Sequence, residues 1–109
     1  MSTMEQRPDQ DCPPTIVPEG AEARELPIIN RRGLHARASA KFVQTVERFD
    51  AEVTVTRYGE TVGGRSIMGL LTLAAASGTT ITVTAKGHDA MACLQAIDDL
   101  LANRFGEDE

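Results

Sequence analysis

Apolar and polar residues alternate along several short stretches of this 109-residue chain. Such alternation is typical of strands with one buried face, and it predicts strands over residues 26–30, 52–57 and 80–86. A turn at residues 58–60 leads into a fourth, shorter strand that ends at Gly63. The pattern therefore indicates a small sheet with four strands.

Three other segments repeat apolar residues every three or four positions, which is the spacing of one buried helical face. The first helix is expected to begin at Ala36. The second is expected to follow Ser66 and to end at the Ser-Gly pair of residues 77–78, and the third to follow Asp89. Ser66 and Asp89 are residue types that commonly cap the N-terminus of a helix.

The predicted element order is strand, helix, strand, strand, helix, strand, helix. This order predicts an α+β fold, an open-faced βαββαβα sandwich in which three helices cover one face of a four-stranded antiparallel sheet. Pro27 has no backbone N–H to donate, so the first strand is expected at an edge of the sheet.

The chain is expected to divide into three parts. Residues 1–24 hold four of the five prolines and show no apolar periodicity, which is typical of a flexible N-terminal extension. Residues 25–105 are expected to form one domain, and residues 106–109 an acidic C-terminal end.

The composition, 41% hydrophobic with no Trp, is that of a small domain with an aliphatic core. No apolar run approaches the roughly 20 residues that span a bilayer, and the N-terminus lacks the pattern of a signal peptide. We therefore expect no membrane insertion and a cytoplasmic location. Cys12 lies in the Pro-rich segment and Cys93 on the apolar side of a predicted helix, so neither a structural disulfide nor a metal site is expected, and no cofactor is implied.

The formal net charge of −5 is unevenly distributed. Acids dominate both ends of the chain, whereas bases outnumber acids between residues 30 and 70. This basic region suits a phosphorylated site or an acidic protein partner. Nucleic-acid binding is the weaker alternative, because the whole chain is acidic and no aromatic residues are interleaved with the bases.

The most informative motif is the Gly-Leu-His-Ala-Arg segment at residues 33–37, which stands where the first helix begins. Helix N-termini carry unpaired N–H groups and partial positive charge, which favour a neutral, nucleophilic His35 and attract phosphate. Arg37 adds a planar donor for phosphoryl oxygens. Together they describe a histidine that accepts a phosphoryl group and passes it on. His88, in a turn, is expected to be an ordinary solvated side chain.

This motif and the Ser-Ile-Met-Gly-Leu-Leu segment at residues 66–71 resemble the histidine phosphocarrier protein family, HPr, of the bacterial phosphoenolpyruvate-dependent phosphotransferase system. The resemblance covers about residues 25–105, which would form an HPr-like phosphocarrier domain. It implies a carrier rather than an enzyme. Enzyme I would phosphorylate His35, at the pros nitrogen (Nδ1) in preference to the tele nitrogen, and a histidine of a IIA protein or domain would take the group.

The same resemblance implies further roles. Arg37 would assist transfer, and Ser66 would be a regulatory site for a kinase/phosphorylase. Partners would dock on a surface around the two motifs, on a protein expected to be a monomer. The residues expected to contact partners are Ala36, Ala38, Arg65, Ile67, Met68 and Leu71.

One residue departs from the pattern of the family. Ala38 stands where members commonly have Pro, which would leave the first helical turn slightly looser without removing the site. Two alternatives remain beside sugar transport: a regulatory phosphoprotein in a nitrogen- or metabolism-linked branch of the system, and the nucleic-acid-binding domain considered above.

Overall fold

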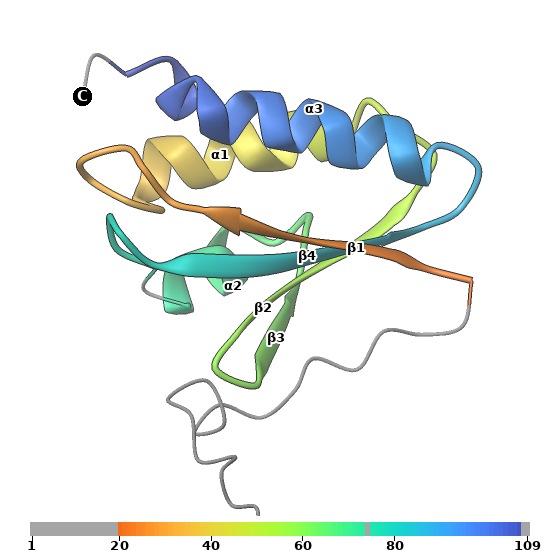
Figure 1. The fold of residues 1–109 in the computed structure, drawn as a ribbon, viewed down its shortest axis with the longest axis horizontal. Coiled ribbons are helices and arrows are strands. Elements are labelled where there is room, and N and C mark those ends of the chain that lie inside the picture. The colour runs from red at the N-terminus through yellow and green to blue at the C-terminus, as the bar shows by residue number, and fades with distance from the viewer. Residues whose placement is uncertain (1–19, 74, 108–109) are drawn as a thin grey trace, which may run out of the picture.

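The structure is a computed structural model that describes residues 20–73 and 75–107, so most of the predicted extension lies outside the described residues. The elements follow the predicted order, with a short turn, η3, added at the end (Figure 1). Their bounds are β1 (Glu22–Pro27), α1 (Ala36–Val46), β2 (Glu52–Arg57), β3 (Glu60–Gly63), α2 (Ile67–Thr72), β4 (Thr80–Lys86), α3 (Ala90–Ala102) and η3 (Arg104–Gly106).

The four strands form one sheet in the order β1-β4-β2-β3, and every neighbouring pair is antiparallel. β1 lies at an edge of the sheet, as the missing N–H of Pro27 predicts. Pro27 is in register with Thr80 of β4. Figure 1 shows α1 and α3 side by side over the sheet, and α2 packs against α1. The three helices cover one face, so the predicted open-faced α+β sandwich is confirmed.

The core lies between the helices and the covered face of the sheet. Alternate residues of β2 and β4, including Val55 and Val83, are fully buried there. Helix α1 contributes Phe42 and Val46, both fully buried, at the spacing of one helical turn. The two predicted periodicities therefore meet in one aliphatic core.

The first strand begins earlier than predicted, at Glu22 instead of residue 26. Residues 22–24 belong to the sheet, so the predicted boundary of the extension at residue 24 is wrong. The apolar–polar alternation of β1 is interrupted at Arg24, a charged residue on the same side of the strand as the buried Leu26. The guanidinium of Arg24 instead reaches Asp98 on α3 at 3.2 Å.

Helix α2 is shorter than predicted and ends at Thr72, not at the Ser-Gly pair of residues 77–78. The chain leaves the helix because Leu73 and Ala75 are both buried, and the carbonyl oxygen of Ala75 accepts the backbone N–H of Leu34 at 2.9 Å. The segment that follows α2 thus holds the loop before α1 in place.

Candidate functional site

The loop before α1 fits closely against the segment that follows α2. Gly33 has a φ of +68°, and a Cβ there would lie only 2.4 Å from the carbonyl oxygen of Ala75. Only glycine fits this left-handed position without moving the backbone. Leu34 is 4% exposed and donates its N–H to the same carbonyl oxygen. The chain is therefore fixed immediately before His35.

His35 is the N-cap residue of α1, with extended backbone angles. Its Nδ1 accepts a hydrogen bond from the backbone N–H of Arg37 at 3.2 Å, and its carbonyl oxygen accepts the N–H of Ser39 at 2.8 Å. Because Nδ1 accepts, the proton of a neutral ring lies on Nε2. The nucleophilic lone pair of His35 therefore faces the N-terminus of the helix, on a side chain that is 23% exposed.

On the other edge of the ring, Nε2 of His35 makes a hydrogen-bond contact with Oε2 of Glu107. Oε1 of Glu107 accepts from Nδ2 of the fully buried Asn30 at 3.1 Å, and the same Nδ2 donates to the carbonyl oxygen of Gly33 at 2.8 Å. The loop before α1 and the segment after α3 thus meet in one hydrogen-bonded group, the His35 cluster (His35, Asn30 and Glu107).

The charge state of Glu107 follows from these neighbours. Burial alone would raise the pKa of this carboxyl group, but hydrogen bonds with Asn30 and His35, and the positive charges of Arg32 and of His35 when its ring is protonated, lower its pKa below the ordinary value of 4.5. The group is therefore an ionised carboxylate at neutral pH, able only to accept hydrogen bonds. It favours a proton on Nε2, in agreement with the acceptor role of Nδ1.

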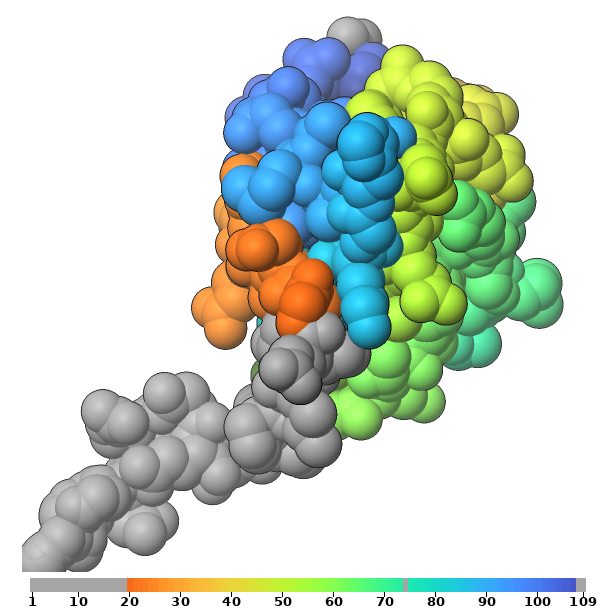
Figure 2. Space-filling view, turned by 90° about the vertical axis from the view of Figure 1, so that its right-hand side faces the viewer, coloured from red at the N-terminus to blue at the C-terminus, as the bar shows by residue number. Residues whose placement is uncertain are grey.

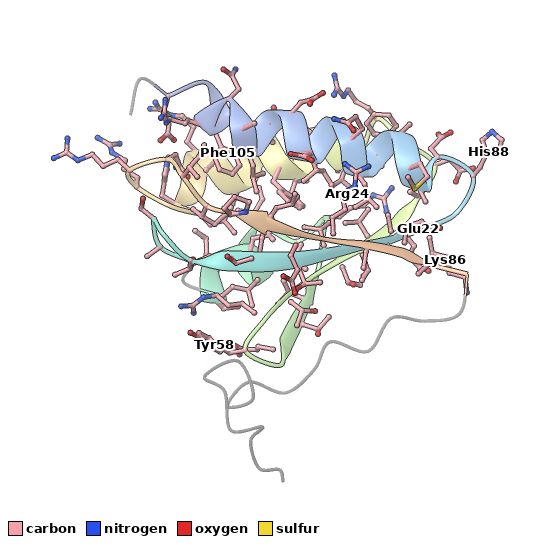
Figure 3. The ribbon with its side chains drawn as sticks, viewed as in Figure 1. Glu22, Arg24, Tyr58, Lys86, His88 and Phe105 are labelled. Atoms are coloured by element: carbon pink, nitrogen blue, oxygen red, sulfur yellow. The ribbon has the colours of Figure 1, made fainter. Side chains whose placement is uncertain are left out.

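Glu107 lies in the end segment, residues 106–109, that is predicted to fall outside the domain, so that division is wrong. Phe105 is 1% exposed and lies under the C-terminal end of α3 (Figure 3), and Gly106 has a φ of +77°. A Phe-Gly pair shortly after the last amphipathic helix is the signal that could have found Glu107, because a buried ring anchors the chain and glycine permits the turn.

Ala36 and Arg37 form the exposed first turn of α1, next to Nδ1 of His35. This turn contains no acidic residue. The guanidinium of Arg37 makes no hydrogen bond or ion pair with any residue that the structure describes. An anion beside Nδ1 would therefore meet the positive end of the helix, in a first turn that also carries a guanidinium.

Ser66 caps α2, since its Oγ accepts the backbone N–H of Gly69 at 2.9 Å, and its predicted capping role is confirmed. The two residues after it are exposed, Ile67 by 39% and Met68 by 71%, whereas Leu71 is half-buried. Exposed large apolar side chains in a row are typical of a protein-binding surface.

Arg65 and Ala38, which are also expected to contact partners, differ in their exposure to solvent. Arg65 is exposed and donates to the carbonyl oxygen of Phe49 at 3.4 Å. Ala38 is fully buried, so its predicted contact with partners is wrong. It lies one helical turn before Phe42 and faces the core with it. The first turn of α1 forms with alanine at this position.

The second histidine lies away from this cluster. Figure 3 shows His88 at the end of the molecule away from Phe105, and this end faces the viewer in Figure 2. Its side chain is 85% exposed, and its Nε2 lies 3.9 Å from Asp89. Asp89 occupies the N-cap position of α3 but accepts the N–H of Asp50 instead of capping the helix. His88 thus has no organised surroundings like those of His35.

Other candidate chemistry is sparse in the described part of the chain. Cys93 is buried in the core, and burial raises the pKa of its thiol. Residues 20–73 and 75–107 contain no group of three or more His, Cys, Asp or Glu side chains placed to hold a metal ion. None of the helices in these ranges is long and apolar enough to cross a bilayer.

Comparison with known proteins agrees with the site. Residues 22–103 match a family model described as the PTS HPr component phosphorylation site, where PTS denotes the phosphotransferase system. The chain belongs to the HPr family. The matched range holds both motifs, so the family resemblance seen in the sequence is confirmed, and the protein is a phosphocarrier component of this system.

Individual relatives are matched over nearly their whole length. The chain is 49% identical to phosphocarrier protein HPr of Neisseria meningitidis serogroup A, over 79% of this chain and 97% of that protein. It is 42% identical to phosphocarrier protein NPr of Shewanella violacea, over 77% and 92%. The crystal structure of HPr from Thermoanaerobacter tengcongensis superposes with a TM-score of 0.78 at 34% identity, over 81% and 99%.

Proposed function

We propose that His35 carries the phosphoryl group and that Nδ1 is the atom bonded to phosphorus. The observation that carries this proposal is the hydrogen bond from the N–H of Arg37 to Nδ1. It places the lone pair of a neutral ring at the N-terminus of α1, where an incoming phosphoryl group meets partial positive charge.

The transfer steps follow from this geometry. Phosphorylated enzyme I, charged from phosphoenolpyruvate, presents a phosphohistidine. The phosphorus–nitrogen bond of the donor breaks as a bond forms between phosphorus and Nδ1 of His35. Backbone N–H groups of Ala36 and Arg37 and the Arg37 guanidinium bind the phosphoryl oxygens. A histidine of a IIA protein then takes the group by the reverse exchange, which regenerates the carrier.

A labelling experiment tests the assignment. The protein is incubated with labelled phosphoenolpyruvate and enzyme I, beside the variants His35→Ala and His88→Ala. We expect one acid-labile, base-stable phosphoryl group per chain in the wild type and in His88→Ala, and none in His35→Ala. Labelling that persists in folded His35→Ala contradicts the proposal.

We propose a docking and regulatory surface at the N-termini of α1 and α2. Its residues are Ala36, Arg65, Ser66, Ile67, Met68 and Leu71. The support is the exposure of Met68 beside a capping serine. A kinase that phosphorylates Ser66 would add negative charge within an apolar surface that partners cover, and desolvation of that charge would weaken docking.

A regulatory branch is the second candidate, and the similarity to a phosphocarrier named NPr favours it. The same phosphohistidine would then control partners without sugar uptake. A transfer experiment separates sugar transport from the regulatory branch. It compares the rate at which the phosphorylated protein donates to purified sugar-specific IIA proteins with the rate to IIA proteins that are not linked to a sugar permease. Transfer at least tenfold faster to one class assigns the branch.

A further inference from the structure

The end of the chain reaches the His35 cluster through an unusual turn. Arg104, Phe105 and Gly106 have φ values of +54°, +56° and +77°. Non-glycine residues adopt this left-handed conformation at an energetic cost, and a run of them persists only where contacts fix it. Phe105 supplies two such contacts, because its ring is buried in the core and its carbonyl oxygen accepts Nζ of Lys41 at 2.5 Å. The turn places Glu107 against the ring of His35.

Asn30 holds Glu107 from the other side. Its Nδ2 donates both to Gly33, in the loop before His35, and to Glu107. Turning the amide over would set its oxygen against two acceptor oxygens, so the amide orientation is fixed by its neighbours. Oδ1 of this fully buried residue has no hydrogen-bond partner among the described residues, which is unfavourable for folding. Stability alone therefore does not account for an asparagine here.

We propose that Glu107 is a positioning residue for phosphoryl transfer, acting through the tautomer and charge of His35. Its carboxylate holds the ring proton on Nε2 and so keeps the Nδ1 lone pair available. When Nδ1 bonds to phosphorus, the ring retains the Nε2 proton and becomes cationic, and Glu107 faces that charge. When the phosphorus–Nδ1 bond breaks, the ring leaves as neutral imidazole. The proposal rests on the proposed function of His35.

The ionisation of Glu107 supports this role. Despite partial burial, the hydrogen bonds and positive charges around the carboxyl group lower its pKa, so it carries its charge throughout the neutral range. A carboxylate that fixes the tautomer of a reacting histidine is an established chemical arrangement in hydrolases that use a serine nucleophile. In this chain the carboxylate comes from beyond the last helix.

The test compares Glu107→Gln and Glu107→Ala with a control, Glu60→Gln, which removes the same charge from an exposed residue of β3. In Glu107→Gln the side chain keeps its shape, but it has one acceptor oxygen for two donors, His35 and Asn30. The first readout is the ¹⁵N spectrum of the His35 ring in the free protein, which reports how the proton is shared between Nε2 and Nδ1. The second is the rate of phosphorylation by enzyme I.

We expect the wild type and Glu60→Gln to hold the proton mainly on Nε2 and to react at equal rates. Both Glu107 variants should show a several-fold larger population with the proton on Nδ1 and transfer about tenfold slower, while the chain remains folded. Wild-type tautomer populations in both variants would overturn the proposal. The spectrum needs no phosphoryl donor, so it tests the role of Glu107 even if His35→Ala is still labelled and the proposed function fails.

Discussion

Replacement of Gly33 by alanine tests how firmly the loop before His35 is fixed against the segment after α2. The new methyl group would lie 2.4 Å from the carbonyl oxygen of Ala75 and 2.9 Å from Cα of Ala76, both backbone atoms that cannot rotate away. A left-handed alanine costs about 1 kcal/mol, and forcing the backbones apart costs about 1–3 kcal/mol more. The expected loss in the free energy of unfolding is therefore about 2–4 kcal/mol.

Two other glycines provide matched controls. Gly78 has a φ of +90° with open space around its Cβ position, so Gly78→Ala should lose only about 1 kcal/mol. Gly63 has neither a left-handed backbone nor a neighbour within 4 Å, so the effect of Gly63→Ala should stay within about 0.5 kcal/mol.

Thermal and urea unfolding of the three variants measure these differences. In a domain of this size about 1 kcal/mol shifts the melting temperature by about 4–8 °C, so a loss of about 2–4 kcal/mol should make Gly33→Ala melt about 8–32 °C below the wild type. Phosphorylation by enzyme I should slow as well, because the displaced loop carries His35. If Gly33→Ala is no less stable than Gly78→Ala, the close contact with residue 75 does not hold the loop, and the reasoning is refuted.

Four other changes probe separate features of the molecule. Arg37→Ala should slow phosphorylation about tenfold, equivalent to about 1.4 kcal/mol of barrier, at an unchanged melting temperature. If the variant is phosphorylated at the wild-type rate, Arg37 has no role in transfer. Ser66→Asp should keep or raise the melting temperature, because acids suit a helix N-terminus, yet slow phosphorylation; an unchanged rate leaves Ser66 as a cap alone. A chain that starts at Gly20 should melt like the full protein, whereas one that starts at Glu25 loses half of β1 and should melt several degrees lower. Equal melting of both would contradict this expectation, because residues 22–24 would then add no stability. The pKa of Glu107 is lowered in the folded state, so its contribution to stability is complete above the ordinary glutamate pKa of 4.5 and is lost as the pH falls through the lower folded pKa. Glu107→Gln should therefore lack this part of the acid transition. Identical acid unfolding curves for the variant and the wild type would contradict this expectation.

The sequence predicts most of the fold because strands and helices bury one face each. Val53 and Val55 in β2, and Ile81 and Val83 in β4, alternate with threonines and are buried as that alternation requires. The cap at Ser66 is also predictable, because a side-chain hydroxyl before an apolar helical repeat has few other roles.

What the sequence hides depends on tertiary contacts. Arg24 breaks the alternation of β1 because its partner, Asp98, lies on a helix 74 residues away. The early end of α2 is set by packing of Ala75 against the loop at Gly33, which no local pattern reports.

The candidate site divides in the same way. His35 and Arg37 are local to one motif and can be predicted from it. Glu107 cannot, since it joins the site only through a left-handed turn and a buried asparagine 77 residues before it. A charged residue near the end of a chain is otherwise typical of a solvated tail.

The central claim, that Nδ1 of His35 carries the phosphoryl group, is tested most directly by NMR of the protein after phosphorylation by enzyme I and phosphoenolpyruvate. We expect a single phosphohistidine whose ³¹P–¹⁵N coupling lies at Nδ1 of His35, with Nε2 still protonated. Coupling at Nε2, at His88, or at no histidine would contradict the claim.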